Sequence, residues 1–415
     1  MTSLPGRKSS GLHPLRTFCF AALALGTGLI PVPGRTAPPP GVVVAHSPAS
    51  TGQYLGSPSL ASLPDGTLLA AQDLFGPGTT GDVLRVHRST DRGATWSLLS
   101  ETRGFWSTLF HHRGALYLIG SRRQDGPAII RRSTDGGRTW TEPVDERTGL
   151  LAVGRYHGAP MPVVEHRGRL WRAMEDTHGP GGWGSNFRSF MLSVPVEADL
   201  LDASAWTFSN RLERDPSWRD GAFGGWLEGN AVVAPDGSLV NLLRADVRKD
   251  VEVAARITVS EDGRTARFDP ATGFLPFPGG CKKFAVRSDP RGDGYWSLSN
   301  WIPPSQRGGN VERTRNTLAL LHSADLEHWE IRCVLLHHPD RERPGYPYAD
   351  FQFDGDDLLG LVRTAHDDDA GGAHSAHDAN YITFHRWPAF RDLQMRDSRR
   401  WSGWVEDEVG TMKSE

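Results

Sequence analysis

A nine-residue pattern occurs twice in this chain. Residues 88–96 read Arg-Ser-Thr-Asp-Arg-Gly-Ala-Thr-Trp, and residues 132–140 read Arg-Ser-Thr-Asp-Gly-Gly-Arg-Thr-Trp. Weaker copies begin at Ser260 and Ser323. Asp and Ser side chains accept hydrogen bonds from nearby backbone N–H groups, and Gly adopts positive φ, so the pattern predicts a tight turn followed by a Trp that covers apolar surface. Recurrence at a fixed spacing indicates a protein built from repeated structural units.

A second periodicity predicts six β-hairpins. Each of six short turns lies between two apolar runs rich in strand-forming residues. The turns are Asp65-Gly66, Arg113-Gly114, Arg167-Gly168, Asp236-Gly237, Asp293-Gly294 and Asp354-Gly355. Asp-Gly between such runs is a strong hairpin signal, and the intervals leave room for four antiparallel strands with loops. We therefore predict an all-β fold, a six-bladed β-propeller of four-stranded antiparallel blades over residues 41–395. A β-sandwich or two barrels are the alternatives, and a hairpin that recurs six times argues against both.

The first 40 residues are predicted to be a signal peptide and a Pro-rich linker. Arg7, Lys8 and Arg16 precede an apolar run from Phe18 to Val32, which Gly and Pro residues interrupt. This run is shorter than the roughly 20 residues that cross a bilayer, so we expect export to the periplasm or medium without stable membrane insertion. A retained membrane anchor is the alternative. Residues 396–415 are expected to form a C-terminal tail.

Charge and cysteine content limit the partners. The net charge of −3 among 415 residues gives no reason to expect nucleic acid as a partner. Beyond Cys19 in the leader, Cys281 and Cys333 remain, either as a disulfide or as two buried thiols. We expect a monomer that needs no cofactor.

Register counting from the six turns predicts a polar site. Residues eight positions before or after a turn lie at the strand ends opposite the hairpin, on one face of the disc. Charged and aromatic side chains gather there, and they include Asp73, Glu175, Glu228, Arg244, Trp301 and Tyr346, with Arg363 one position beyond the counted Val362. Salt bridges that seal the blades are the alternative explanation for any single member.

The repeated turn pattern resembles the Asp box of the sialidase superfamily, which lies on the outside of each blade. Three further segments resemble functional sialidase segments, and they begin at Glu228, Arg315 and Gly345. The resemblance implies that Tyr346 is the nucleophile and that Glu228 is its base. It also implies that Arg244 and Arg315 bind the carboxylate of an acidic sugar.

The chain departs from the sialidase pattern in its first blade. Gly56 stands where sialidases carry an Arg, so one of three carboxylate-binding arginines is absent. The acid/base Asp is either Asp73 or Asp82. Loss of one arginine weakens carboxylate binding, so another terminal sugar, again acidic, is the expected substrate.

Several other residues are candidates for the same site. His157 precedes a predicted inner strand, and Glu175-Asp176 end the strand that follows. His377 belongs to a late loop rich in His and Asp whose spacing matches no standard zinc signature, so no metal is predicted. Lys282-Lys283 either attract an anionic ligand or are solvated. Four Trp residues are candidates for stacking on sugars: Trp106, Trp183, Trp226 and Trp301.

The sequence thus predicts an exported, exo-acting glycoside hydrolase with a glycan or oligosaccharide substrate. Two alternatives remain. One is a carbohydrate-binding propeller without turnover. The other is a polysaccharide lyase that uses His157 and a Tyr to remove a proton beside a uronate carboxylate.

Overall fold

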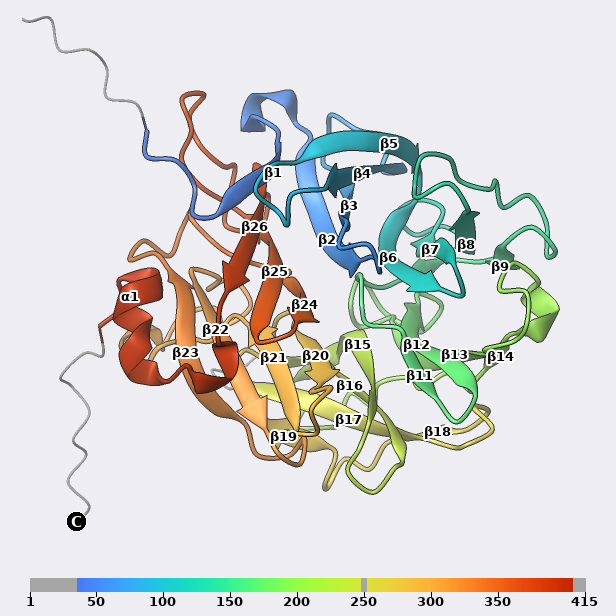
Figure 1. Cartoon of the computed structure of the whole chain (residues 1–415). Helices are drawn as coiled ribbons and strands as arrows, with labels where there is room; N and C mark the ends of the chain where they lie inside the picture. The colour runs from blue at the N-terminus through green and yellow to red at the C-terminus, as the bar shows by residue number, and fades with distance from the viewer. Residues whose placement is uncertain (1–35, 248–251, 406–415) are drawn as a thin grey trace, which may run out of the picture. The chain divides into compact units, whose positions relative to one another are not determined.

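The computed structural model describes residues 36–247 and 252–405, which contain six antiparallel sheets around a central axis (Figure 1). The predicted six-bladed β-propeller is confirmed. Residues 1–35, which hold most of the predicted signal peptide, lie outside the described residues.

The first three blades follow one another along the chain, each running from an inner to an outer strand. Blade 1 consists of β2 (Tyr54–Ser62), β3 (Leu68–Phe75), β4 (Val83–Ser89) and β5 (Ser97–Arg103). Blade 2 consists of β6 (Phe105–His112), β7 (Ala115–Ser121), β8 (Ala128–Ser133) and β9 (Leu150–Ala152). Blade 3 consists of β10 (Tyr156–His157), β11 (Val164–His166), β12 (Arg169–Asp176), β13 (Arg188–Pro195) and β14 (Thr207–Phe208). Both β10 and β11 pair with β12, so they are two pieces of one inner strand.

The last three blades include the one that closes the ring. Blade 4 consists of β15 (Phe223–Val233), β16 (Leu239–Val247), β17 (Val253–Val259), β18 (Ala266–Arg267) and β19 (Phe274–Pro276). Blade 5 consists of β20 (Ala285–Ser288), β21 (Tyr295–Ser299), β22 (Thr317–Ser323) and β23 (Glu330–His337). Blade 6 consists of β24 (Asp350–Asp354), β25 (Asp357–Thr364), β26 (Tyr381–Trp387) and, as its outer strand, β1 (Val42–His46). Because β1 comes from the other end of the chain, its pairing with β26 joins the first and last parts of the ring.

All six predicted hairpin turns lie between the first two strands of a blade. Gly66, Gly114 and Gly168 have φ between 70° and 82°, the left-handed region that their tight turns require. The local turn signal therefore located every inner hairpin.

The repeated boxes form the turns between the third and fourth strands. In the second copy, Asp135 Oδ1 accepts hydrogen bonds from Ser133 Oγ and from the Thr139 N–H, at 2.8 and 3.0 Å, and its Oδ2 accepts from Thr139 Oγ1 at 2.6 Å. These bonds lower the pKa of Asp135, first through the Thr139 hydroxyl. The boxes are structural elements of the outer blade, as expected.

The hydrophobic core lies between the blades. One cluster of buried side chains spans each interface between neighbouring blades, including the interface between blades 6 and 1. Inner strands of neighbouring blades also contact one another, as β2 does with β6 and β24. Burial is thus shared around the ring, and the inner strand ends are held in fixed relative positions.

The described chain ends in short helical segments. The helix α1 (Ser398–Ser402) follows the 3₁₀ turns Phe390–Asp392 and Met395–Asp397 and contacts β23. Ser398, in the predicted tail, is buried, and its Oγ accepts a hydrogen bond from the Val334 N–H at 2.9 Å. Three further 3₁₀ turns span Ala49–Thr51, Ala203–Ala205 and Pro304–Gln306. Within the described ranges, no helix has the length and apolar character to cross a membrane. Cys281 and Cys333 are buried free thiols.

Candidate active site

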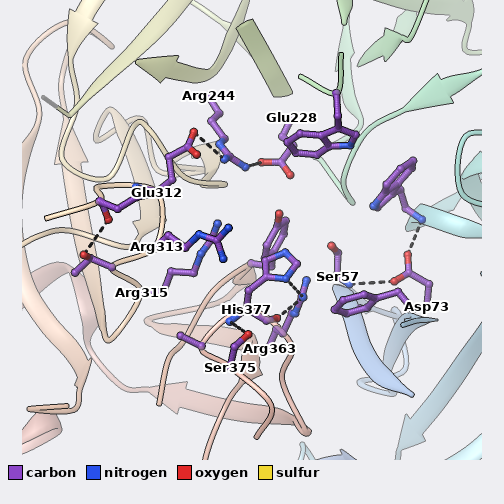
Figure 2. A pocket seen from close by; sticks show the side chains of 18 of the residues that line it. Ser57, Asp73, Glu228, Arg244, Glu312, Arg313, Arg315, Arg363, Ser375 and His377 are labelled. Carbon is purple, nitrogen blue, oxygen red and sulfur yellow. Dashed lines mark hydrogen bonds and ion pairs between the residues drawn. The ribbon is translucent and has the colours of Figure 1, made fainter. Parts of the chain in front are cut away.

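A cavity of about 720 Å³ opens at the strand ends opposite the hairpin turns (Figure 2). The first strands of blades 1, 2, 3 and 4 reach it with Ser57, Trp106, His157 and Glu228. The second strands reach it with Asp73, Arg244 and Arg363. Register counting had placed most of these residues on this face.

Three residues that line the cavity have left-handed backbones without being glycine. Trp106, Glu228 and Tyr348 have φ of 48°, 60° and 57°. The strand register also shifts at the first two, between Phe105 and Thr108 and between Leu227 and Asn230. Such conformations persist only where surrounding structure holds them, and bulges turn side chains toward a site. The inner strands are therefore distorted where they meet the cavity.

Glu228 and Arg244 form a buried ion pair at the cavity wall. Arg244 Nη1 lies 3.2 Å from Glu228 Oε2, and its Nε donates to the Cys281 carbonyl at 2.9 Å. Arg244 Nη2 also lies 3.5 Å from Glu312 Oε1. Burial opposes the charge on Arg244, but Glu228 and Glu312 raise the pKa of its guanidinium above the ordinary value. These contacts hold the Glu228 side chain in place at the edge of the cavity (Figure 2).

Tyr348, which the sequence did not single out, is the tyrosine that lines the cavity. Arg363 and Arg315 lie over its ring, with guanidinium carbons 4.7 and 5.5 Å from the ring centroid. Burial, and then the nearby Glu228 carboxylate, raise the pKa of the Tyr348 phenol. Glu228 is thus close enough to influence its ionisation.

The prediction that Tyr346 faces the site is corrected. Tyr346 is absent from the cavity lining and packs in the hydrophobic cluster between blades 5 and 6. Burial raises the pKa of its hydroxyl to about 12. The residues before β24 are not in a strand, and the left-handed turn at Tyr348 breaks the alternation that the register count assumed.

Arg315 and Arg363 present unpaired nitrogen atoms. Arg315 Nη1 and Arg363 Nε are buried and have no hydrogen-bond partner among the described residues. Burial lowers the pKa of Arg363 to about 10 and also lowers the pKa of Arg315. A buried donor without a hydrogen-bond partner destabilises the folded protein. A ligand that places an acceptor oxygen beside Arg315 Nη1 or Arg363 Nε would satisfy these donors.

Asp73 fills the space that a side chain at position 56 would need. A Cβ on Gly56 would lie 1.5 Å from Asp73 Oδ1. That oxygen accepts a hydrogen bond from the Ser57 N–H at 3.2 Å, and Oδ2 accepts one from the Trp106 N–H at 2.6 Å. Burial nevertheless raises the pKa of Asp73 to about 6. The absence of an Arg at position 56 is therefore linked to the position of this carboxyl group.

Of the two candidate acid/base residues, Asp73 lines the cavity and Asp82 does not. Asp82 is not part of the cavity lining and lies 3.7 Å from Arg103 Nη1. Asp73 lines the cavity and is 2% exposed.

His157 lines the cavity, with Glu175 behind it. His157 Nδ1 hydrogen-bonds Glu175 Oε2 at 3.2 Å, and Glu175 Oε1 accepts from the Gly229 N–H at 3.3 Å. Glu175 is fully buried and does not reach the cavity, so it orients His157 and the strand that carries Glu228.

The late His-rich loop reaches the cavity through His377. Its Nδ1 hydrogen-bonds Asp378 Oδ1 at 2.7 Å, and its carbonyl accepts a hydrogen bond from Arg363 Nη2. Burial, and then the charge of Arg363, lower the pKa of His377 to about 3. His377 is therefore a neutral side chain that faces the ring of Tyr348.

Asp176 and Trp301 are corrected, because neither belongs to the cavity lining. Asp176 accepts hydrogen bonds from Arg188 Nε and Nη2 at 2.7 and 3.0 Å and lies 3.3 Å from Arg211 Nε. Trp301 packs in the core between blades 4 and 5, beside Trp404. For Asp176, these are salt bridges of the kind that the alternative explanation named, whereas Trp301 is a packing residue.

The cavity also contains residues that register counting did not find. They come from loops and from strand ends, and include Phe75, Gln124, Trp183, Glu312, Arg313 and Arg341. In Figure 2, Arg313 and Arg315 stand on the opposite side of the view from Asp73 and Ser57. Trp106 and Trp183 were foreseen as stacking residues, whereas Trp226 is buried in blade 4. Over residues 36–247 and 252–405, no three His, Cys, Asp or Glu side chains are grouped as a metal site would need.

Comparisons with known proteins agree with the fold. No family model matches the chain, and no curated protein matches it either. Among solved structures, an α-L-arabinanase of Penicillium chrysogenum bound to arabinobiose superposes with a TM-score of 0.53 at 14% identity, covering 85% of this chain and 98% of that one. A Hadza microbial sialidase gives 0.56 at 15% identity, with 84% and 68% covered. A Trypanosoma rangeli sialidase bound to sialic acid gives 0.50 at 15% identity, with 80% and 54% covered. At these identities the likeness establishes the propeller fold that the chain shares with these sugar-cleaving enzymes.

Proposed function

We propose that this protein is an exo-acting glycoside hydrolase that removes a terminal acidic sugar from a glycan. One observation carries the proposal. Tyr348, Glu228 and Asp73 line the same cavity as three arginines, Arg244, Arg315 and Arg363. In the proposed reaction, Tyr348 is the nucleophile, Glu228 is its base and Asp73 is the acid. The three arginines form the cationic wall of the cavity, which binds the charge of the sugar.

Tyr348 is the nucleophile of the proposed reaction. A phenol whose pKa is raised by burial is a poor nucleophile until a base removes its proton. Glu228 takes that proton as the Tyr348 oxygen bonds to the anomeric carbon and the bond to the leaving group breaks. A Tyr in place of a carboxylate suits an anionic substrate, because the substrate's own charge would repel a carboxylate nucleophile.

Asp73 is the acid and then the base. Its raised pKa keeps a large fraction of the carboxyl group protonated near pH 6, so it can donate a proton to the leaving oxygen. In the second step, the resulting Asp73 carboxylate takes a proton from the water that attacks the anomeric carbon. Glu228 returns its proton to the Tyr348 oxygen as the bond between that oxygen and the sugar breaks, so all three residues regain their starting protonation states.

The arginines recognise the charge of the sugar. Arg315 and Arg363 offer buried donors without protein partners, which suit a carboxylate. Arg363 comes from blade 6, so it supplies a third cation although blade 1 carries Gly56. The altered placement favours an acidic sugar whose carboxylate is oriented differently from that of sialic acid, with hexuronic acids as the first candidates.

A product screen tests this function. Wild-type protein is incubated with sialosides, hexuronides and neutral glycosides, and the saturated sugars released are identified by mass spectrometry. We expect release of an acidic monosaccharide from the chain end. Turnover of neutral glycosides alone would contradict the proposed role of the arginines.

A polysaccharide lyase is the second candidate, and the His157–Glu175 pair favours it. His157 lines the cavity and has a buried carboxylate to orient it, as a proton-abstracting base requires. A lyase would release an unsaturated product that absorbs in the ultraviolet. Absorbance during digestion of a polyuronate therefore distinguishes the two reactions.

The proposal includes export and a monomeric state. Both rest on the sequence of residues 1–40 and on the self-contained character of a closed propeller. Sequencing of the mature N-terminus tests the first, and sedimentation analysis tests the second.

A further inference from the structure

Two consecutive lysines lie near the start of β20, separated from it by Phe284, and both are buried. Lys282 and Lys283 are 0% and 1% exposed, and neither lines the cavity. Burying an ammonium group is costly unless it is paired and hydrogen-bonded, so two in succession call for a structural or functional cause. Their partners supply one.

Lys283 holds the backbone next to the proposed nucleophile. Its Nζ donates a 2.5 Å hydrogen bond to the carbonyl of Ala349, the residue after Tyr348. On the far side, Asp350 accepts hydrogen bonds from the Leu60 N–H at 2.8 Å and from Arg287 Nη2 at 3.1 Å. Tyr348 has a φ of 57°, which a non-glycine residue keeps only when neighbouring contacts hold it. These contacts fix the turn that points Tyr348 into the cavity.

Lys282 holds the neighbouring loop in the same manner. Its Nζ donates to the Val311 carbonyl at 2.9 Å and lies 3.5 Å from Glu252 Oε1. Val311 directly precedes Glu312, Arg313, Thr314 and Arg315, all of which line the cavity. The second lysine thus anchors the loop that supplies a large part of the cationic wall.

We propose that Lys282 and Lys283 form a lysine brace that positions the nucleophile loop and the arginine loop relative to each other. Because the two residues are adjacent in the chain, the distance between the anchored carbonyls of Val311 and Ala349 is set by a single short segment. The brace explains why the cations are buried away from the ligand. The changes in kcat and KM that the brace predicts rest on the proposed function. The change that it predicts in the position of Tyr348 does not.

The charges around Lys283 agree with this role. Burial lowers the pKa of its amine to about 8, and the carboxylates of Asp350 and Glu228 oppose that fall. At neutral pH the group therefore remains an ammonium with three donors, able to keep its bond to the Ala349 carbonyl.

Substitution of each lysine by methionine tests the brace, because methionine retains most of the volume and cannot donate a hydrogen bond. Activity is measured on the 4-methylumbelliferyl glycosides of sialic acid and glucuronic acid. For Lys283→Met we expect kcat to fall by about 100-fold with KM nearly unchanged, the scale of a 1 Å misplacement of a reacting group. For Lys282→Met we expect KM to rise more than kcat falls, because Arg315 binds the substrate. Lys283→Gln, which keeps an N–H donor, should lie between wild type and Lys283→Met, and it carries the kinetic test if the methionine variant does not fold.

Arg131→Met is the matched control. Arg131 is 1% exposed in β8, bonds to the Arg103 and Thr141 carbonyls at 2.7 Å each, and lines no part of the cavity. The Arg131→Met variant should have a lower melting temperature than wild type, with kcat and KM of the folded enzyme unchanged. If it reproduces the losses of the lysine variants, the lysines stabilise the fold in general and the brace is refuted.

A crystal structure of Lys283→Met, or of Lys283→Gln if needed, gives a readout that needs no substrate. We expect Tyr348 to leave the left-handed region and its ring to shift in the cavity. An unchanged Tyr348 overturns the brace, whether or not the wild type hydrolyses either glycoside. Absence of hydrolysis by the wild type, with a displaced Tyr348 in the variant, instead counts against the proposed function.

Discussion

The stability of the folded protein should carry a pH dependence that originates in Asp73, and Asp73→Asn should remove it. Burial raises the pKa of this carboxyl group from 3.8 to about 6, although hydrogen bonds from the Trp106 and Ser57 N–H groups oppose the rise. The folded state therefore holds the proton more tightly than the unfolded chain. The stabilisation is complete below pH 4 and is lost as the pH rises through 6. A shift of this size corresponds to about 3 kcal/mol.

Thermal unfolding of wild type and Asp73→Asn between pH 3.5 and 7.5 measures this effect. The Asn side chain cannot accept from both N–H groups, which costs about 1–3 kcal/mol at every pH. Apart from this constant difference, the free energy of unfolding of the variant should rise by about 3 kcal/mol relative to that of wild type between pH 4 and 7. That is roughly 4 °C in melting temperature for a unit of this size. Parallel curves for the two proteins would refute the assignment of a raised pKa to Asp73.

Four other predictions concern the site and the repeated turns. If Asp73 must be protonated in the free enzyme, kcat/KM should fall as the pH rises above 6, and a constant kcat/KM from pH 5 to 8 would exclude that role. Tyr348→Phe should lower kcat by more than about 10³-fold, whereas Tyr346→Phe should leave it near the wild-type value; the reverse order in a steady-state assay would return the role to Tyr346. Gly56→Ala should displace the Asp73 carboxyl group and abolish hydrolysis, whereas Gly182→Ala, at a position with open space around it, should remain active. An active Gly56→Ala enzyme would show that hydrolysis does not depend on the position of the Asp73 carboxyl group. Asp135→Ala should lower the melting temperature in calorimetry without changing kcat, and a stable but inactive variant would contradict the structural role of the boxes.

The fold was predictable because its signals are local. A tight turn such as Asp65-Gly66 is encoded by residues that favour positive φ or bond to their own backbone, and the same signal recurs in every blade. The order of the strands then follows from short connections between neighbours. Pairing of β1 with β26 is different, because no local signal in residues 42–46 specifies the last blade.

The site was predictable where the strands are regular. Asp73 and Arg244 lie in second strands whose alternation is intact, so counting from the turn located them. Arg363 lies in the corresponding strand of blade 6, one position beyond the counted Val362. Counting failed before β24, where the left-handed backbone of Tyr348 moves the site residue by two positions. It also failed at Trp301, which follows the end of β21 at Ser299 and packs into the core.

Counting from the turns could not locate residues in loops, because the count applies only to regular strands. Glu312 and Arg313 enter the cavity from a segment between β21 and β22, whose path depends on contacts such as that of Lys282 with the Val311 carbonyl. Lys282 and Lys283 were expected to face a ligand or solvent. The structure places both inside the protein, where Lys282 donates to the Val311 carbonyl and Lys283 to the Ala349 carbonyl.

The most direct test of the central claim is to identify the residue that becomes covalently linked to the substrate. The protein is incubated with 2,3-difluorosialic acid and, separately, with 2-deoxy-2-fluoroglucuronyl fluoride, then digested and sequenced by tandem mass spectrometry. We predict a glycosyl adduct on the Tyr348 oxygen, formed by wild type and absent from Tyr348→Phe. An adduct on Tyr346 or Glu228, or turnover of the parent glycosides with no adduct on Tyr348, would contradict the proposed mechanism.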